Sequence, residues 1–166
     1  MPIYELRPFT LSEAEWVAGW AATPEELQEV SASDDFPLSV DQVAAWTYEA
    51  DFVFTLRREG DLVAYGEIVE DSVEGDVEIQ HLLVAPDMRS AGIGKALLSR
   101  LCAFLAAALP YSEVWLRVGR ENISAAACAR AVGFEAVEKM CGPRYLWMKK
   151  NLTDPALPSQ PTEEKL

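Results

Sequence analysis

One stretch of the sequence joins the patterns of a strand, a tight turn and a long helix. The run Val77–Val84 is rich in β-branched and apolar residues, and Pro86 ends it because proline cannot donate to a strand ladder. Apolar residues then recur at 93, 97, 101, 105 and 109, which predicts a helix with one buried stripe. Gly92 and Gly94 lie at the junction, so the chain turns there without side chains to obstruct it.

Glycine-rich turns that open helices commonly hold phosphate groups, and spacing separates the known motifs. A dinucleotide fingerprint needs a small residue where this chain has Leu97, and a P-loop needs a glycine at Arg89 and a hydroxyl residue at Ala96. Both motifs are excluded. What remains is an anion site formed by backbone N–H groups and a helix N-terminus, with Arg89 and Lys95 adding charge suited to a pyrophosphate. The structural alternative is a plain βα turn.

The rest of the chain predicts a mixed sheet protein of the α/β (α+β) class. Strands are expected at 3–7, 52–56, 62–69, 113–118, 134–139 and 144–149, and further helices near 11, 23, 39 and 124. A capping box from Ser12 to Glu15 is expected at the first helix. We expect one domain over residues 1–152 and, from its prolines and charges, a disordered tail over 153–166.

The charge balance restricts the classes of partner. The chain has 27 acidic and 14 basic residues and a formal net charge of −13, which would repel a nucleic-acid backbone. Nucleic acid is therefore not an expected partner, whereas cationic small molecules or basic peptides would be attracted. A merely soluble acidic surface is the alternative interpretation.

The cysteines, the N-terminus and the histidine count indicate the compartment and the metal content. Cys102, Cys128 and Cys141 are odd in number and widely spaced, which indicates reduced thiols. The N-terminus lacks a targeting leader and no apolar stretch reaches the length of a membrane span, so we expect a cytoplasmic protein without a membrane partner. Only one histidine, His81, is present and no cluster has metal-ligand spacing, so no metal is expected.

Two sets of residues resemble the GNAT superfamily of N-acetyltransferases. Its cofactor motif is Val-x-Pro followed by Arg/Gln-x-x-Gly-x-Gly/Ala at the start of a helix, and Val84, Pro86, Arg89, Gly92 and Gly94 match it. A second signature, Asn-x-x-Ala with Gly-Phe further on, is matched by Asn122, Ala125, Gly133 and Phe134. The resemblance extends from about Val77 to Lys149.

The resemblance implies a GNAT-like fold with a mixed, mostly antiparallel sheet of about seven strands flanked by helices. The sheet would splay open between two central parallel strands and admit acetyl-CoA. Backbone groups of Leu82, Leu83 and Val84 would pair with the pantetheine arm and hold the acetyl oxygen, and Asn122 would face the cofactor. The pyrophosphate would be held by the turn made of Arg89, Ser90, Ala91, Gly92, Ile93, Gly94 and Lys95. Helices within residues 8 to 50 would shape the acceptor pocket.

Acetyl transfer to an amine requires a base, because the substrate ammonium must lose a proton. Glu78 is the first candidate for the catalytic residue, since it matches the position where some family members carry a glutamate base. Strict alternation places it on one face with Gln80, Leu82 and Val84, and places His81 on the opposite face. Glu67 on the preceding strand is the second candidate, and His81 is the third.

The chain departs from the family pattern at the acid that protonates the leaving thiolate. Many family members have a tyrosine seven positions after the asparagine, where this chain has Ala129. Cys128, Tyr145 or unaided departure of the thiolate remain as alternatives. Four tryptophans could line the acceptor pocket or pack in the core: Trp16, Trp20, Trp46 and Trp147.

The leading hypothesis is an N-acetyltransferase that moves an acetyl group from acetyl-CoA to a primary amine of a small molecule or peptide within a ternary complex. The alternative is an acyl-CoA-binding sensor or regulatory module with little turnover. The sequence leaves a homodimer open.

Overall fold

The computed structural model describes residues 1–152, which form a seven-stranded sheet in the order β1-β2-β3-β4-β5-β7-β6. β4 and β5 are paired in parallel and the other neighbours are antiparallel. The strands are β1 (Tyr4–Pro8), β2 (Phe52–Arg58), β3 (Asp61–Asp71), β4 (Asp76–Val84), β5 (Glu113–Gly119), β6 (Glu135–Ala136) and β7 (Tyr145–Asn151). The predicted mixed, mostly antiparallel sheet is confirmed. The tail expected over 153–166 lies outside the described residues.

The helices of the described residues begin at residues suited to cap them. Within residues 1–152 they are α1 (Ala14–Ala18), α2 (Pro24–Ser31), α3 (Val40–Glu49), α4 (Ile93–Ala108) and α5 (Ile123–Val132), with 3-10 turns at Leu11–Glu13, Pro86–Met88 and Glu138–Met140. The side chains of Thr23 and Ser39 accept hydrogen bonds from N–H groups in the first turns of α2 and α3.

Two predicted element boundaries differ from the structure. The capping box was expected from Ser12 to Glu15, but the carboxylate of Glu13 accepts the N–H of Thr10, so the helical segment begins two residues earlier. The strand expected over 134–139 is limited to β6, because the chain forms a 3-10 turn at Glu138–Met140.

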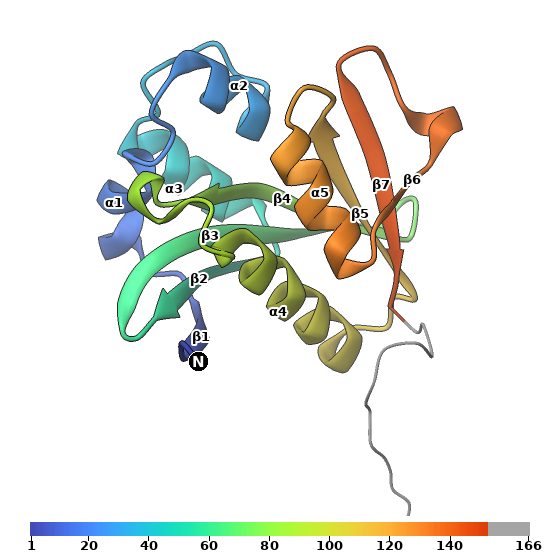
Figure 1. Ribbon diagram of the computed structural model, residues 1–166, viewed down its shortest axis with the longest axis horizontal. Coiled ribbons are helices and arrows are strands. Elements are labelled where there is room, and N and C mark those ends of the chain that lie inside the picture. Colours follow the sequence, from blue (N-terminus) through green and yellow to red (C-terminus); the bar gives the residue numbers. More distant parts are fainter. Residues whose placement is uncertain (153–166) are drawn as a thin grey trace, which may run out of the picture.

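Each face of the sheet is covered by its own set of helices. α4 and α5 lie together on one face (Figure 1) and pack in a large core with residues such as Leu97, Leu101 and Phe134. α1, α2 and α3 cover the other face, where Leu27 and Trp46 belong to a second core. The sheet therefore separates two cores, and each polar side chain on a strand faces one core or the other.

A β-bulge in β4 changes which side chains face each of the two cores. Tyr65 of β3 is opposite Leu83, but Glu67 is opposite Gln80, so β4 contains an extra residue in this interval. His81 lies in this interval with a φ of 53°, a left-handed conformation that is uncommon outside glycine. Side chains that face one another across paired strands lie on the same side of the sheet.

The bulge overturns the alternation expected for β4. Gln80 lies beside Glu67 on the α1–α3 side, and His81 contacts Glu67 from the same side. Leu82 and Val84 instead pack in the core beneath α4. Glu78 therefore does not share a face with Leu82 and Val84, and His81 does not lie opposite Glu78, because the bulge reverses the phase of the strand after Gln80.

Gly66 provides the space that the bulge requires. A Cβ atom on Gly66 would lie 2.9 Å from Leu82 Cδ2 and 3.0 Å from Leu101 Cδ1. Gly66→Val should therefore overpack this contact and lower the free energy of unfolding by about 1–3 kcal/mol. Gly142→Val is the matched control, since a Cβ there would have no neighbour within 4 Å. Denaturant unfolding measures both variants, and equal stabilities would contradict the packing argument.

Candidate active site

β4 and β5 separate at the centre of the sheet. Their parallel pairing consists of Glu78 with Trp115 and Ile79 with Leu116, and no further pair joins them among the described residues. The edge of β4 that faces β5 is therefore without a neighbouring strand beyond Ile79. At the far end of β5, the side chain of Asn122 caps α5 by accepting the N–H of Ala125 at 3.1 Å. The break in pairing between β4 and β5, beyond Ile79 and Leu116, is called the cleft from here on.

The glycine-rich turn has the geometry expected of an anion cradle. Ser90 and Gly92 both have positive φ, at 65° and 82°. Gly92 immediately precedes α4, and no side chain caps the helix there. The first N–H groups of α4 therefore have no hydrogen-bond acceptor within the helix or from a capping side chain. A Cβ on Gly92 would meet no atom within 4 Å, which shows that the space above the turn is open. These features fit a phosphate group.

Arg89 and Lys95, the two cations of the cradle, differ in their surroundings. Lys95 is exposed in the first turn of α4. The guanidinium of Arg89 donates to Glu26 Oε2 and to the carbonyl of Trp20, both at 2.7 Å, and to the carbonyl of Val84 at 3.2 Å. In this structure Arg89 therefore holds the turn against α2 and the segment before it.

Glu26, the partner of Arg89, is stabilised as an anion. Burial opposes its ionisation, but hydrogen bonds from the N–H of Ala22 and from Arg89 outweigh that effect, so the pKa of Glu26 lies below its ordinary value. The pair is therefore charged at neutral pH.

A buried carboxylate connects β3 to the bulge of β4. Glu67 is only 1 % exposed. Its carboxyl group accepts a hydrogen bond from the Tyr65 hydroxyl and lies within hydrogen-bond distance, 2.8 Å, of His81 Nδ1. The His81 ring stacks on Trp46 of α3 with centroids 4.0 Å apart and planes at 10°. Burial, together with the charge of Glu67, raises the pKa of Tyr65 far above its ordinary value, so the tyrosine remains a donor.

Glu78 lies at the start of the cleft beside an acidic groove. Burial raises the pKa of Glu78, while a hydrogen bond from Gln80 and the charges of Arg117 and His81 oppose the rise. The groove has a volume of about 470 Å³ and lies on the α1–α3 side of the sheet. Its walls combine carboxylates with large side chains: Glu70, Asp71, Asp76, Glu78, Trp115, Met140 and Trp147.

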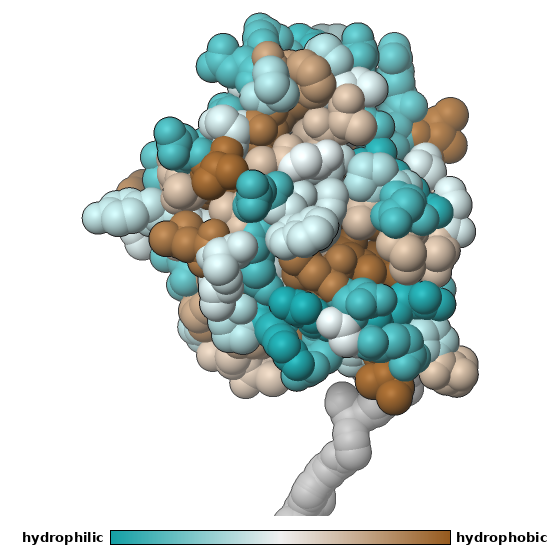
Figure 2. Space-filling model, turned by 90° about the vertical axis from the view of Figure 1, so that its left-hand side faces the viewer, coloured by the Kyte–Doolittle hydropathy of each residue, from teal (hydrophilic) through white to brown (hydrophobic). Residues whose placement is uncertain are grey.

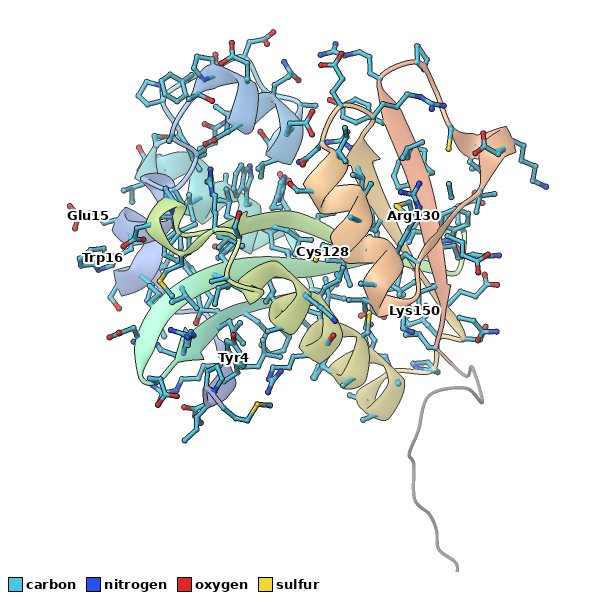
Figure 3. All side chains as sticks on the ribbon, in the orientation of Figure 1. Tyr4, Glu15, Trp16, Cys128, Arg130 and Lys150 are labelled. Atoms are coloured by element: carbon cyan, nitrogen blue, oxygen red, sulfur yellow. The ribbon has the colours of Figure 1, made fainter. Side chains whose placement is uncertain are left out.

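The three residues considered for the leaving-group acid lie in different places. Ala129 is fully buried in the core beneath α5. Cys128 lies between α5 and the start of α4 (Figure 3), where its sulfur would be 3.6 Å from a Cβ on Gly94, and burial raises its pKa. Tyr145 places its hydroxyl 3.5 Å from the carbonyl of Gln28 and its ring beneath Arg117.

The four tryptophans are divided between surface and core. Trp16 is 67 % exposed and, with the buried Trp20, lines a second groove of about 570 Å³ near the β2–β3 turn. Figure 2 shows the side of the molecule that is on the left in Figure 1, where hydrophobic residues appear in patches among hydrophilic ones. Trp46 is buried against His81, and Trp147 lines the acidic groove in an edge-to-face contact with Trp115.

Sequence reasoning identified Glu67 and His81 as separate candidates but missed their contact. The contact depends on the bulge, which brings residues on neighbouring strands to one face. Tyr65 was missed altogether. Its position two residues before Glu67 on a predicted strand was the available signal, because such residues share a face.

Comparison with known proteins establishes the family. A sequence model of the Acetyltransferase (GNAT) family matches residues 13–134. The chain therefore belongs to the GNAT acetyltransferase family, as the motifs indicated. Membership makes it an acetyl-CoA-dependent N-acetyltransferase and identifies acetyl-CoA as its cofactor. No curated protein sequence matches the chain significantly.

Solved structures share the fold at low sequence identity. The spermidine N-acetyltransferase from Vibrio cholerae, in complex with CoA and spermine, has a TM-score of 0.73 and 16 % identity over 90 % of this chain and 96 % of its own. A ribosomal-protein-alanine N-acetyltransferase from Brucella melitensis has a TM-score of 0.71 and 20 % identity over 89 % and 99 % of the two chains. AAC(6')-Ib, in complex with paromomycin and acetyl-CoA, has a TM-score of 0.73 and 15 % identity over 89 % and 93 %.

A bulky side chain at Gly92 should block the cradle. Gly92→Leu would project into the open space above the turn and should weaken coenzyme A binding about tenfold, or about 1.4 kcal/mol. Gly75→Leu is the control, because Gly75 also has positive φ, at 73°, and open space around it but lies in the β3–β4 turn. Calorimetry with coenzyme A compares the two. Equal affinities would argue against cofactor binding at this turn.

Proposed function

We propose that this chain transfers the acetyl group of acetyl-CoA to the primary amine of a cationic small molecule or peptide, by direct attack within a ternary complex. The observation that carries the proposal is the break in pairing between β4 and β5 beyond Ile79. The glycine-rich turn follows the end of β4, and the acidic groove is lined by Asp76, Glu78 and Gln80 of the same strand. Acetyl-CoA supplies the thioester, and the chain's own residues bind and deprotonate the amine.

The cofactor end of the cleft is formed by backbone groups. The first N–H groups of α4, at Ile93, Gly94 and Lys95, together with the turn Arg89–Gly92, would hold the pyrophosphate. Backbone groups of Leu82, Leu83 and Val84 would align the pantetheine arm, and a strand N–H near Leu82 would stabilise the acetyl oxygen. Asn122 lies at the other wall, at the start of α5.

The acceptor end carries negative charge and aromatic walls. Four carboxylates, Glu78 among them, and two tryptophans line the groove, a combination that attracts and packs against ammonium groups. The net charge of −13 acts in the same direction over a longer range. The V. cholerae neighbour binds spermine and AAC(6')-Ib binds paromomycin, and both ligands are amines. We therefore favour an acceptor with more than one ammonium group.

Acetyl transfer can be tested with an amine panel that contains monoamines, polyamines, aminoglycosides and basic peptides. Thiol release from acetyl-CoA should depend on the amine and should be fastest with acceptors of higher positive charge. Calorimetry of the cofactor alone provides the second measurement. Cofactor binding without turnover on any amine would support a sensor instead, and absence of binding at near-millimolar acetyl-CoA would remove both functions.

Glu78 is the proposed acceptor of the first substrate proton. A base must be ionised, and burial raises the pKa of Glu78 above its ordinary 4.5, so kcat/KM should fall on the acid side at a pH above that value. Glu78→Gln should lower kcat about 100-fold and leave the affinity for acetyl-CoA nearly unchanged. Steady-state kinetics across pH measure both effects. Equal rates for the two proteins would exclude Glu78 as the base.

A further inference from the structure

The Tyr65–Glu67–His81 chain fixes the tautomer of the single histidine. A carboxylate can only accept hydrogen bonds, so the contact from His81 to Glu67 requires that Nδ1 carries the hydrogen. In the neutral ring Nε2 is then the basic nitrogen. Nε2 makes no hydrogen bond to the residues that the structure describes.

Contacts from two elements hold the imidazole in place. Trp46 stacks on one face of the ring, and the bulged backbone fixes the Cα position. His81 directly precedes Leu82, and it lies on the side of the sheet that contains Glu78 and the acidic groove. Its charge is close enough to that of Glu78 to influence the pKa of this carboxyl. The ring is therefore held in one orientation on the same side of the sheet as Glu78.

The reaction leaves one proton without an assigned carrier. A primary ammonium loses two protons on becoming an amide, and Glu78 accounts only for the first. Ala129 offers no acid for the departing thiolate. The Cys128 sulfur packs near Gly94 by the start of α4, and the Tyr145 hydroxyl is directed to α2, so neither shares the position of His81 at the bulge.

We propose that His81 carries the second proton from the substrate nitrogen to the leaving sulfur, with Glu67 and Tyr65 as positioning residues. His81 Nε2 accepts this proton as the N–C bond forms, and donates it to the sulfur as the C–S bond breaks. The ring ends neutral, the thiol leaves protonated, and the first proton passes from Glu78 to solvent. This inference rests on the proposed acetyl transfer to an amine.

Several charged or titratable groups face His81 and must be considered in its pH dependence. From β3 these groups are Glu67 and Tyr65. From β4, the strand of His81, the group is Glu78, which also interacts with Arg117 of β5. From α3 the ring contacts Trp46, which does not titrate.

Nuclear magnetic resonance tests the tautomer without any turnover. The 166-residue chain contains one histidine, so its imidazole nitrogens give one set of signals. In the protein with coenzyme A bound, the nitrogen shifts of the neutral ring should show hydrogen on Nδ1. Glu67→Gln should shift the population toward hydrogen on Nε2. A wild-type ring with hydrogen on Nε2 would overturn the proposal.

Kinetics of His81→Asn test the transfer itself. Asparagine tolerates positive φ better than most residues, so the bulge should be retained. We expect kcat to fall about 100-fold and the KM for acetyl-CoA to stay unchanged. Glu67→Gln should lower kcat by at least about tenfold through loss of the orienting carboxylate. Unchanged kcat in His81→Asn at every pH would overturn the proposal.

A matched pair of tyrosines separates a positioning effect from general destabilisation. Tyr65 and Tyr111 each donate to a glutamate of β3, Tyr65 to Glu67 and Tyr111 to Glu70, but only Glu67 contacts the histidine. Tyr65→Phe should lower kcat and Tyr111→Phe should not. Equal kcat values for the two variants would show that Tyr65 is not a positioning residue for His81. If wild-type protein transfers acetyl groups while His81→Asn is unaffected, only this inference fails and the proposed function stands.

Discussion

An extra residue in β4 shifts its register against β3 at His81, and the arrangement of the cleft depends on this shift. Before the bulge, Glu78 and Gln80 point to the face of the sheet that α1–α3 cover. After it, Leu82 and Val84 point to the core beneath α4. Pairing with β5 ends just before the same place. One irregular residue thus lets a single strand supply polar side chains to one side and a free backbone edge to the cleft.

Much of the fold could be predicted because the determinants are local. The four-residue apolar spacing after Gly92 produced α4, and Thr23 and Ser39 cap the helices that follow them. Predicted element boundaries were wrong where neighbouring residues compete to begin a helix or to continue a strand. Thr10 and Glu13 begin the first helical segment in place of Ser12 and Glu15, and the chain after β6 turns into a 3-10 helix although its sequence favours a strand.

The candidate site was less predictable, for two physical reasons. The cradle depends on backbone conformations that glycines permit, so its motif is visible in sequence. The side-chain contacts depend on nonlocal geometry: strict alternation fails at the bulge, and no local pattern indicates that His81 meets Glu67 on another strand. Arg89 likewise joins Glu26, which lies 63 residues earlier in the chain.

The contacts of Arg89 connect the glycine-rich turn to α2. Its guanidinium holds Glu26 of α2 and the carbonyl of Trp20 before it, yet it belongs to the turn proposed to hold the phosphates. A phosphate that draws Arg89 toward itself would compete with Glu26 for the guanidinium. Thermodynamic linkage makes such an exchange reciprocal, so a change that weakens the contact with Glu26 would raise phosphate affinity by the same factor.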